Sequence, residues 1–389
     1  TLFRSHAPEG TVMRPSLARA LALPAVLAFV CVAAQSPAAV IPIDDTRSLT
    51  ASIKAQTRLS YEQGRVVDGS QTDGQFDGSV HRMYVILGGQ MNPKLSTLAI
   101  FAGNRVGQAG RDASAIGVGT AFAVRDAWVR MDVADALRVQ VGRMYVPFLR
   151  CFGTEGSFTI QTLDLPSCQA SGLVPGLRAA RDDGAVVWGN VSGGRGQYRV
   201  GVMDSSDVSA GAAPRFAGRV VVNLFRPEAG WFTTAAHLSG DAIVSLGAGV
   251  DHLANFDIDG RDHLGLTGDA YVSAPVTRDI RVIAEGSVTA VDQDDVGWSG
   301  THYSASVGAV VASEGLPTGP LHPYIAYQKF EPAAAVVDPP SQDSELGVGL
   351  NLYPGRLGHA FKLTLDWSRV SPRDEDAYAR VTAQTQLSF

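Results

Sequence analysis

The stretch "YARVTAQTQLSF", residues 378–389, decides the fold, because its side chains alternate between apolar and polar. One parity carries Ala379, Val381, Ala383, Thr385, Leu387 and Phe389, and the other carries Arg380, Thr382, Gln384, Gln386 and Ser388. Successive side chains of a β-strand point to opposite faces, so this stretch predicts a strand with one apolar face and one polar face.

The same alternation recurs along the chain, for example at residues 50–62 and 360–369. A sandwich strand alternates as well, so alternation alone does not distinguish a β-sandwich from a membrane barrel. The runs are about ten residues long, as a tilted membrane-spanning strand requires. Aromatic residues such as Tyr61, Trp367 and Phe389 lie toward the ends of runs, as in the aromatic girdles of outer-membrane barrels. We therefore expect an all-β, transmembrane, antiparallel β-barrel.

The runs predict sixteen strands. They lie near residues 50–62, 79–88, 94–103, 120–132, 136–146, 184–191, 196–204, 216–225, 242–253, 263–273, 279–290, 301–312, 322–330, 344–352, 360–369 and 378–389. If the first strand runs outward, the even-to-odd connections are mostly short and the odd-to-even connections are longer, as in outer-membrane barrels. The connection near 226–241 is the exception. In the fourth run, the apolar parity of Val124 differs from that of Val129, so its register stays open.

The beginning of the chain has the pattern of a secretory signal peptide. Arg14 and Arg19 precede the apolar run "ALALPAVLAFVCVAA", and small residues follow it. Met13 is the natural initiator, so residues 1–39 are expected to be an over-extended start plus a cleaved signal, with the barrel at 40–389. No later stretch is a transmembrane helix candidate, and the formal charge of −6 gives no sign of a nucleic-acid partner.

The longest connection, residues 147–183, follows the fifth strand. Pro147 cannot donate a ladder hydrogen bond and should end that strand, with Phe148 capping the rim. Cys151 and Cys168 survive signal cleavage into an oxidising compartment, which favours a disulfide between them over two free thiols. We expect this third external loop to fold toward the pore and narrow it.

Residues 126–148, "DAWVRMDVADALRVQVGRMYVPF", resemble the phosphate-selective porin O and P family, whose motif leads into the constriction loop. Gly142, Arg143, Val146, Pro147 and Phe148 match that motif. The glycine-rich strand 243–252 is similar as well. The terminal Phe389 resembles the signature by which the assembly machinery recognises outer-membrane barrels. The resemblance implies a sixteen-stranded, often trimeric barrel in the outer membrane of a Gram-negative bacterium that passes small anions such as phosphate.

Cationic side chains on the parity assigned to the lumen would favour anions. The wall would contribute Lys54, Arg58, Arg82, Arg138, Arg199, Arg219, Arg281, Lys362 and Arg380, and the third loop Arg150, Arg178 and Arg181. Because the chain has only four lysines, arginine supplies most of this charge. Acidic residues on the same parity, Asp269, Glu285, Glu345 and Asp366, could neutralise much of it. Both an anion-preferring pore and an unselective pore therefore remain open.

The expected function is that of a passive porin for small hydrophilic solutes, and the sequence contains few signs of another function. The sequence contains no zinc-protease, nucleophile-elbow or phosphate-loop motif, so neither an enzyme nor a cofactor nor a metal is expected. The glycine pairs in "GAGVDH" and "GVGLNL" lack the context for dinucleotide binding and more simply relieve crowding in curved strands. A barrel-borne hydrolase using His237, His252, His263 or His302, and a soluble secreted β-sandwich or adhesin, are the alternatives.

Overall fold

The structure is a computed structural model. It describes residues 38–67, 70–71, 74–106, 122–153, 156–164, 180–205, 213–257, 259–312, 319–334, 336 and 342–389. Residues 1–37, which hold nearly all of the expected leader, lie outside this description, so the signal peptide stays a prediction. The helices of the described ranges are single turns, and none is long and apolar enough to cross a membrane.

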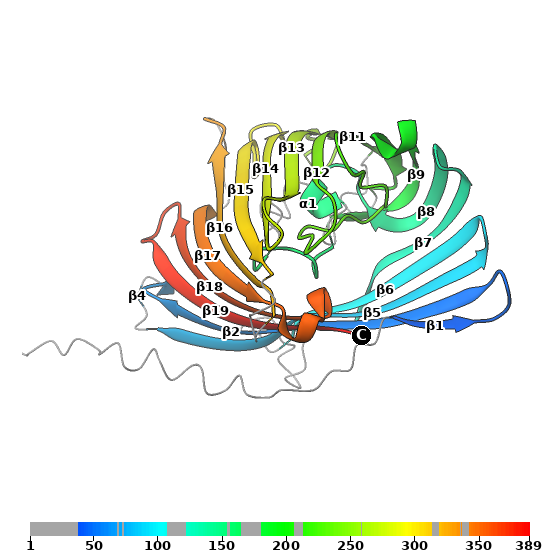
Figure 1. Cartoon of the computed structure of the whole chain (residues 1–389). Coiled ribbons are helices and arrows are strands. Elements are labelled where there is room, and N and C mark those ends of the chain that lie inside the picture. The colour runs from blue at the N-terminus through cyan, green and yellow to red at the C-terminus, as the bar shows by residue number, and fades with distance from the viewer. Residues whose placement is uncertain are drawn as a thin grey trace, which may run out of the picture. The chain divides into compact units, whose positions relative to one another are not determined.

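Sixteen long strands form one closed antiparallel barrel, which confirms the predicted fold class (Figure 1). They are β2 (Ser48–Gln63), β5 (Gln75–Asn92), β6 (Leu95–Val106), β7 (Ala123–Ala134), β8 (Leu137–Tyr145), β9 (Arg181–Val191), β10 (Gly196–Met203), β11 (Arg215–Asn223), β12 (Ile243–Leu253), β13 (His263–Pro275), β14 (Ile280–Asp292), β15 (Gly300–Val311), β16 (Leu321–Pro332), β17 (Gln342–Leu352), β18 (Phe361–Pro372) and β19 (Tyr378–Ser388). The last strand, β19, pairs with the first long strand, β2, which closes the barrel. Each predicted run corresponds to one of these strands. Because the sheet closes on itself through β19 and β2, the fold is not the β-sandwich that the sequence left as an alternative.

Three short strands were not predicted. β1 (Ala39–Pro42) pairs antiparallel with the beginning of β2. β3 (Val66–Val67) and β4 (Ser70–Gln71) form a small hairpin within the first long connection, between β2 and β5. They are too short to show a period of two, so an alternation search could not find them.

The barrel wall is apolar outside and polar inside. In β10, Val200 and Val202 are exposed (59% and 46%), whereas Gln197 and Arg199 between the same strand ends are buried. This is the reverse of a soluble protein, in which aliphatic side chains are buried and charged ones are exposed. Valine and leucine dominate the outward positions of β10–β18, and amides, hydroxyls and charged groups dominate the inward ones. This distribution is typical of a transmembrane β-barrel.

The register of β7, left open by the sequence, is explained by a bulge. Ile100 of β6 pairs with Asp126 and Phe101 pairs with Val124, so Arg125 has no partner across the ladder. One extra residue in a strand shifts all following side chains to the other face. The bulge therefore lets Val124 and Val129 both point outward although their spacing is odd.

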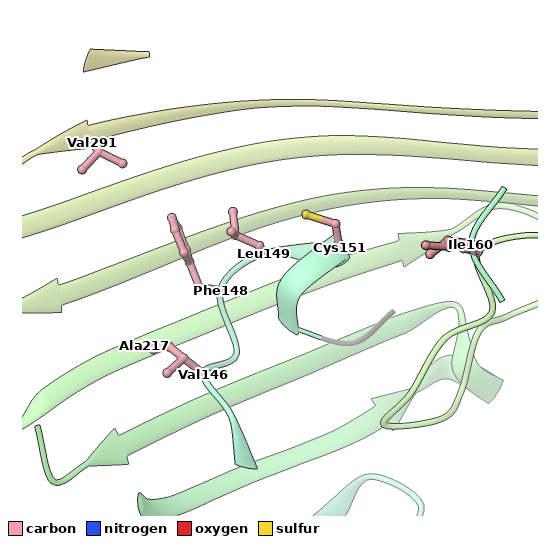
Figure 2. Packing of buried hydrophobic residues seen from close by; sticks show 8 residues of the cluster. Val146, Phe148, Leu149, Cys151, Ile160, Ala217 and Val291 are labelled. Atoms are coloured by element: carbon pink, nitrogen blue, oxygen red, sulfur yellow. The ribbon is translucent and has the colours of Figure 1, made fainter. Parts of the chain in front are cut away.

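Two connections enter the barrel interior: the third loop, described first, and the connection between β11 and β12. The third loop leaves β8 at Val146, and its short helix α1 (Arg150–Gly153) lies within the ring of strands (Figure 1). Phe148 does not cap the rim as expected: it is fully buried, and its ring approaches Gly265 of β13 so closely that a Cβ there would lie 2.8 Å from Cζ. Figure 2 shows Phe148, Leu149 and Cys151 packed along the strands behind them. Pro147 lies just beyond the end of β8, as expected.

Candidate functional site in the barrel lumen

Residues 156–164 of the third loop lie along the inner wall from β15 to β5. Their backbone carbonyls accept hydrogen bonds from inward-facing side chains on successive strands, so the wall fixes the backbone of this segment. The donors and acceptors are Asn351 to Gln161 (2.6 Å), Lys362 to Ile160 (2.9 Å), Gln386 to Phe158 (2.8 Å), Gln56 to Ser157 (3.3 Å) and Arg58 to Leu163 (2.7 Å). Buried carbonyl groups require such partners, so this row of donors is a docking strip for the loop.

The last described residue of this segment, Asp164, connects the loop to β2 and β5. Its carboxylate accepts hydrogen bonds from Arg58 (2.6 and 2.8 Å) and Arg82 (2.8 Å) and lies 3.2 Å from His81 Nε2. Burial alone would raise the pKa of Asp164, but the adjacent positive charges, above all Arg58, hold this pKa well below its usual value. Asp164 is therefore ionised at neutral pH, and two of the predicted pore arginines, Arg58 and Arg82, share its single negative charge.

The exceptional connection between β11 and β12, residues 224–242, also enters the barrel. Its Glu228 is held by two hydrogen bonds from Arg150 of α1, at 2.7 and 3.0 Å, and by Ser245 Oγ at 2.9 Å. Burial favours the neutral acid, yet the Arg150 guanidinium lowers the pKa of Glu228 far below its usual value. Arg150 also lies over the ring of Tyr271, with its Cζ 4.0 Å from the ring centroid. We call residues 224–242 the inner link.

The inner link and the third loop meet inside the barrel. The backbone N–H of Ala236 donates to Thr159 O at 2.8 Å, and the N–H of Ala235 donates to Thr159 Oγ1 at 3.1 Å. The N–H of Gly156 donates to Thr233 O at 3.2 Å. The two segments start from opposite ends of the barrel, because the loop follows β8 outward and the link joins the inward-running β11 to β12. Together they cross the lumen.

The predicted pore cations fall into two groups. The first group is paired with carboxylates: Arg58 and Arg82 with Asp164, Arg138 with Asp135 and Asp132, Arg150 with Glu228, Arg181 with Asp126, Arg219 with Asp269, and Arg380 with Glu345. The sequence predicted four acidic residues on the lumen side, and two of them, Asp269 and Glu345, form ion pairs in this group as expected. A third, Glu285, lies 3.8 Å from Arg150 Nε.

The second group, Lys54, Arg199, Arg281 and Lys362, has no carboxylate within ion-pair distance among the described residues. Lys54 lies over the ring of Phe158, with Nζ 5.5 Å from the centroid. Arg199 donates to Gln197 Oε1 and Gly230 O, and Arg281 donates to Ser273 Oγ and Gly240 O. Lys362 is fully buried beneath the third loop. Within the described ranges their direct contacts are therefore with amide, hydroxyl, backbone carbonyl and aromatic groups rather than with carboxylates.

The motif residues have identifiable local roles. Gly142 has φ +125°, and a Cβ there would lie 2.2 Å from Ala127 O, so only glycine fits this position of β8. Arg143 forms an ion pair with Asp183 of β9 at 2.5 Å. Val146 is buried and its N–H donates to Ala180 O. The motif thus shapes the exit of the chain from the wall into the third loop.

The remaining predicted positions are partly outside the described ranges. Cys151 is disulfide-bonded, but Cys168 and Arg178 lie outside those ranges, so the Cys151–Cys168 pairing and a pore role for Arg178 stay predictions. Phe389 exchanges backbone hydrogen bonds with Ile53 of β2, at 2.6 and 2.9 Å. Its part in recognition by the assembly machinery also stays a prediction.

Sequence reasoning missed the two acidic residues that hold the internal segments, Asp164 and Glu228. Neither lies on a strand, so the inward and outward parity could not place it. The connection at 226–241 is much longer than a simple turn, which needs only a few residues. This length was the feature of the sequence that could have indicated the inner link.

The histidines considered for a hydrolase do not assemble around a serine in the described contacts. His263 Nε2 lies 3.2 Å from Asp251, and its Nδ1 lies 3.2 Å from Gln293. His237 contacts Arg226 and lies 3.8 Å from Glu228. Within the described ranges no three histidine, cysteine or acidic side chains form a group that could hold a metal ion.

No protein-family model matches the sequence, and no curated protein matches it either. Solved structures with the same fold include an anion-selective porin from Comamonas acidovorans, with 12% identity over 88% of this chain and 100% of that chain and a TM-score of 0.55. OprB of Pseudomonas putida has 11% identity over 88% and 94%, with a TM-score of 0.55. The outer membrane channel DcaP of Acinetobacter baumannii has 12% identity over 88% and 98%, with a TM-score of 0.54. The fold is therefore that of the outer-membrane porins.

Proposed function

We propose that this protein is a passive porin of the Gram-negative outer membrane that admits small hydrophilic solutes and prefers anions. The apolar outer wall supports a position in lipid, and the polar interior supports an aqueous path. Inside a barrel whose lumen is crossed by the third loop and the inner link, only small solutes can pass. Catalysis plays no part in this proposal.

The observation that carries the anion preference is the set of lumen cations without carboxylate partners. Lys54, Arg199, Arg281 and Lys362 add positive charge that the described acidic residues do not neutralise by direct contact. The field of an uncompensated charge persists in a narrow, partly dehydrated passage and raises the local anion concentration. An anion-selective porin is among the structures of the same fold, which agrees with the proposal.

The solute and the partners follow from the resemblance in the sequence. The family motif at 142–148 suggests phosphate or a similar small anion, because guanidinium groups match phosphate oxygens with two parallel hydrogen bonds. We also propose a homotrimer, outer-membrane lipid as the surrounding solvent, and insertion by the barrel-assembly machinery through the strand that ends at Phe389.

The test is the reversal potential of the refolded protein in a planar bilayer under a potassium chloride gradient. We expect anion selectivity, and a decrease in selectivity in the double variant Lys54→Gln/Arg281→Gln. A unit charge 4 Å from an ion changes its energy by about 1 kcal/mol in water, roughly a fivefold change in local concentration. Adding phosphate at constant ionic strength should reduce the chloride current if phosphate binds in the lumen.

Arg369→Gln is the matched control, because Arg369 is an exposed, outward-facing residue of β18. Its replacement should leave the reversal potential unchanged. Cation selectivity of the wild-type channel would contradict the proposed anion preference. A chain that folds and inserts but conducts no current would contradict the porin function itself.

A further inference from the structure

A groove with a volume of about 480 Å³ crosses β13, β14, β15 and β16, which lie side by side in the wall (Figure 1). The three large side chains of its lining, Val288, Tyr303 and Tyr327, are 48%, 36% and 44% exposed. They alternate along their strands with buried inward residues such as Thr289 and His302. The groove therefore opens on the lipid-facing side of the barrel and not into the lumen.

Small residues in register on neighbouring strands form the floor of the groove. Ala270 pairs with Gly286, and Gly286 pairs with Ala305. Neighbouring strands are about 4.8 Å apart, so this row is about 10 Å wide. Tyr327, which pairs with Ala305, closes one end of the row. A Cβ on Gly268, beside the row on β13, would meet no heavy atom within 4 Å. The wall is thus hollow here because large side chains are missing.

The charged residues of β16 indicate the depth of the groove in the membrane. The strands alternate in direction, so β16 runs outward like β8. Lys329 and Glu331 follow Tyr327 on the same face and form an ion pair at 2.6 Å. Charged groups avoid the hydrocarbon core, so this pair marks the headgroup level of the outer leaflet. Lys329 is two residues beyond Tyr327, so the Tyr327 end of the groove lies no more than about 7 Å below that level.

The occupant of the groove follows from this depth. The hydrocarbon core of a bilayer is about 30 Å thick, so the acyl chains of one leaflet extend over about 15 Å, and the Tyr327 end of the groove lies beside them. The groove is continuous with the lipid-facing wall around it. An empty hollow would forfeit the dispersion contacts of its lining, whereas a flexible acyl chain can follow the groove and make them. A second barrel would have to reach the floor with side chains of a rigid, convex wall.

We propose that this groove holds one acyl chain of an outer-leaflet lipid, seated on the small residues and bordered by Val288, Tyr303 and Tyr327. The headgroup of that lipid lies at the level of Lys329 and Glu331. The seated lipid is then a bound component of the barrel and not exchangeable solvent. The inference concerns the outer wall, so it does not depend on the proposed anion preference.

The experiment is native mass spectrometry of the full chain, extracted with mild detergent from liposomes of palmitoyl-oleoyl-phosphatidylethanolamine and washed free of loose lipid. We expect the wild type to retain one lipid. Gly286→Leu should reduce the retained fraction by about fivefold or more, because leucine takes the place of the chain and removes its many weak contacts. A side chain is tolerated at residue 286, since its Cβ would meet only a backbone oxygen at 3.5 Å.

Gly218→Leu is the matched control. Gly218 is an outward-facing glycine of β11 outside the groove, and its Cβ would also lie 3.5 Å from a backbone oxygen. This variant should retain lipid like the wild type. Ala305→Leu fills the floor from the neighbouring strand β15 and should reproduce the loss seen with Gly286→Leu. None of these residues faces the lumen, so an unchanged reversal potential in a planar bilayer verifies that each variant folds.

The position of the lipid is tested with a phosphatidylethanolamine that carries a diazirine on one acyl chain. After photolysis in liposomes, we expect cross-links in the wild type to concentrate on β13–β16. Cross-links spread evenly around the wall would overturn the proposal, even if neither leucine variant folds. No lipid retained by the wild type, or equal retention by the wild type and the folded leucine variants, would overturn it as well. If these variants change the oligomeric state without loss of lipid, a second copy of the chain occupies the groove and the proposal is wrong.

Discussion

Glu228 is the residue through which the inner link holds the third loop. Its carboxylate is buried, and so is the guanidinium of its partner Arg150. A buried ion pair contributes little net stability, but the loss of one partner leaves an uncompensated charge in a medium of low polarity. The pair is therefore sensitive to changes in either residue.

Glu228→Gln should destabilise the folded barrel by about 3–5 kcal/mol, the usual cost of breaking a buried pair. The measurement is the midpoint of thermal unfolding in detergent, followed by the loss of β circular dichroism. Glu331→Gln is the matched control, since Glu331 forms an exposed pair with Lys329. Exposed pairs contribute little, so we expect no measurable change there. Equal midpoints for wild type and Glu228→Gln would show that Arg150 does not depend on Glu228.

At the scale of elements, the third loop is held mainly through its backbone, by side chains of the barrel wall. Amide, amine and guanidinium groups on β2, β17, β18 and β19 donate hydrogen bonds to the backbone carbonyls of the loop. The hydroxyl of Ser306 on β15 adds a further contact, accepting from Gln161 Nε2 at 2.6 Å. Asp164 is the one ion-paired anchor in residues 156–164. The position of the loop should therefore respond to pH through Asp164.

Because the folded pKa of Asp164 is depressed, its stabilising contribution is present above the unfolded pKa of about 3.9 and is lost as pH falls through the folded value. We expect the loop to resist pepsin at pH 4 and to be cleaved faster at pH 2, with rates normalised to an unfolded substrate. Asp164→Asn should be cleaved at similar normalised rates at both pH values. A wild-type loop already released at pH 4 would contradict a depressed pKa.

At the scale of the whole molecule, the wall is stable only with an apolar solvent outside. The exposed valine, leucine and aromatic side chains of the outer wall would cause aggregation in water. Each of the sixteen long strands is hydrogen-bonded to two neighbours, so the wall itself has no open edge. We expect the purified chain to require detergent and to migrate faster unheated than heated on a denaturing gel. Solubility as a monomer without detergent would contradict the membrane position.

The sequence by itself determined the barrel. Side-chain alternation indicates which face of each strand contacts lipid. Because alternation depends only on residues next to one another in the chain, the sequence alone was enough to locate the sixteen strands. The inward parity of Arg199 and Arg219 follows from the same period. The bulge at Arg125 could be suspected from a change of parity at Val124.

Only the tertiary structure decided what the lumen contains. The contacts of Asp164 and of Glu228 join segments that are far apart in sequence, and neither residue lies in a stretch with a periodic pattern. Whether an inward arginine faces a carboxylate or remains uncompensated depends on which loop residue reaches it across the barrel. Such long-range pairings are set by the closed ring of strands, which brings all inward faces within reach of one another.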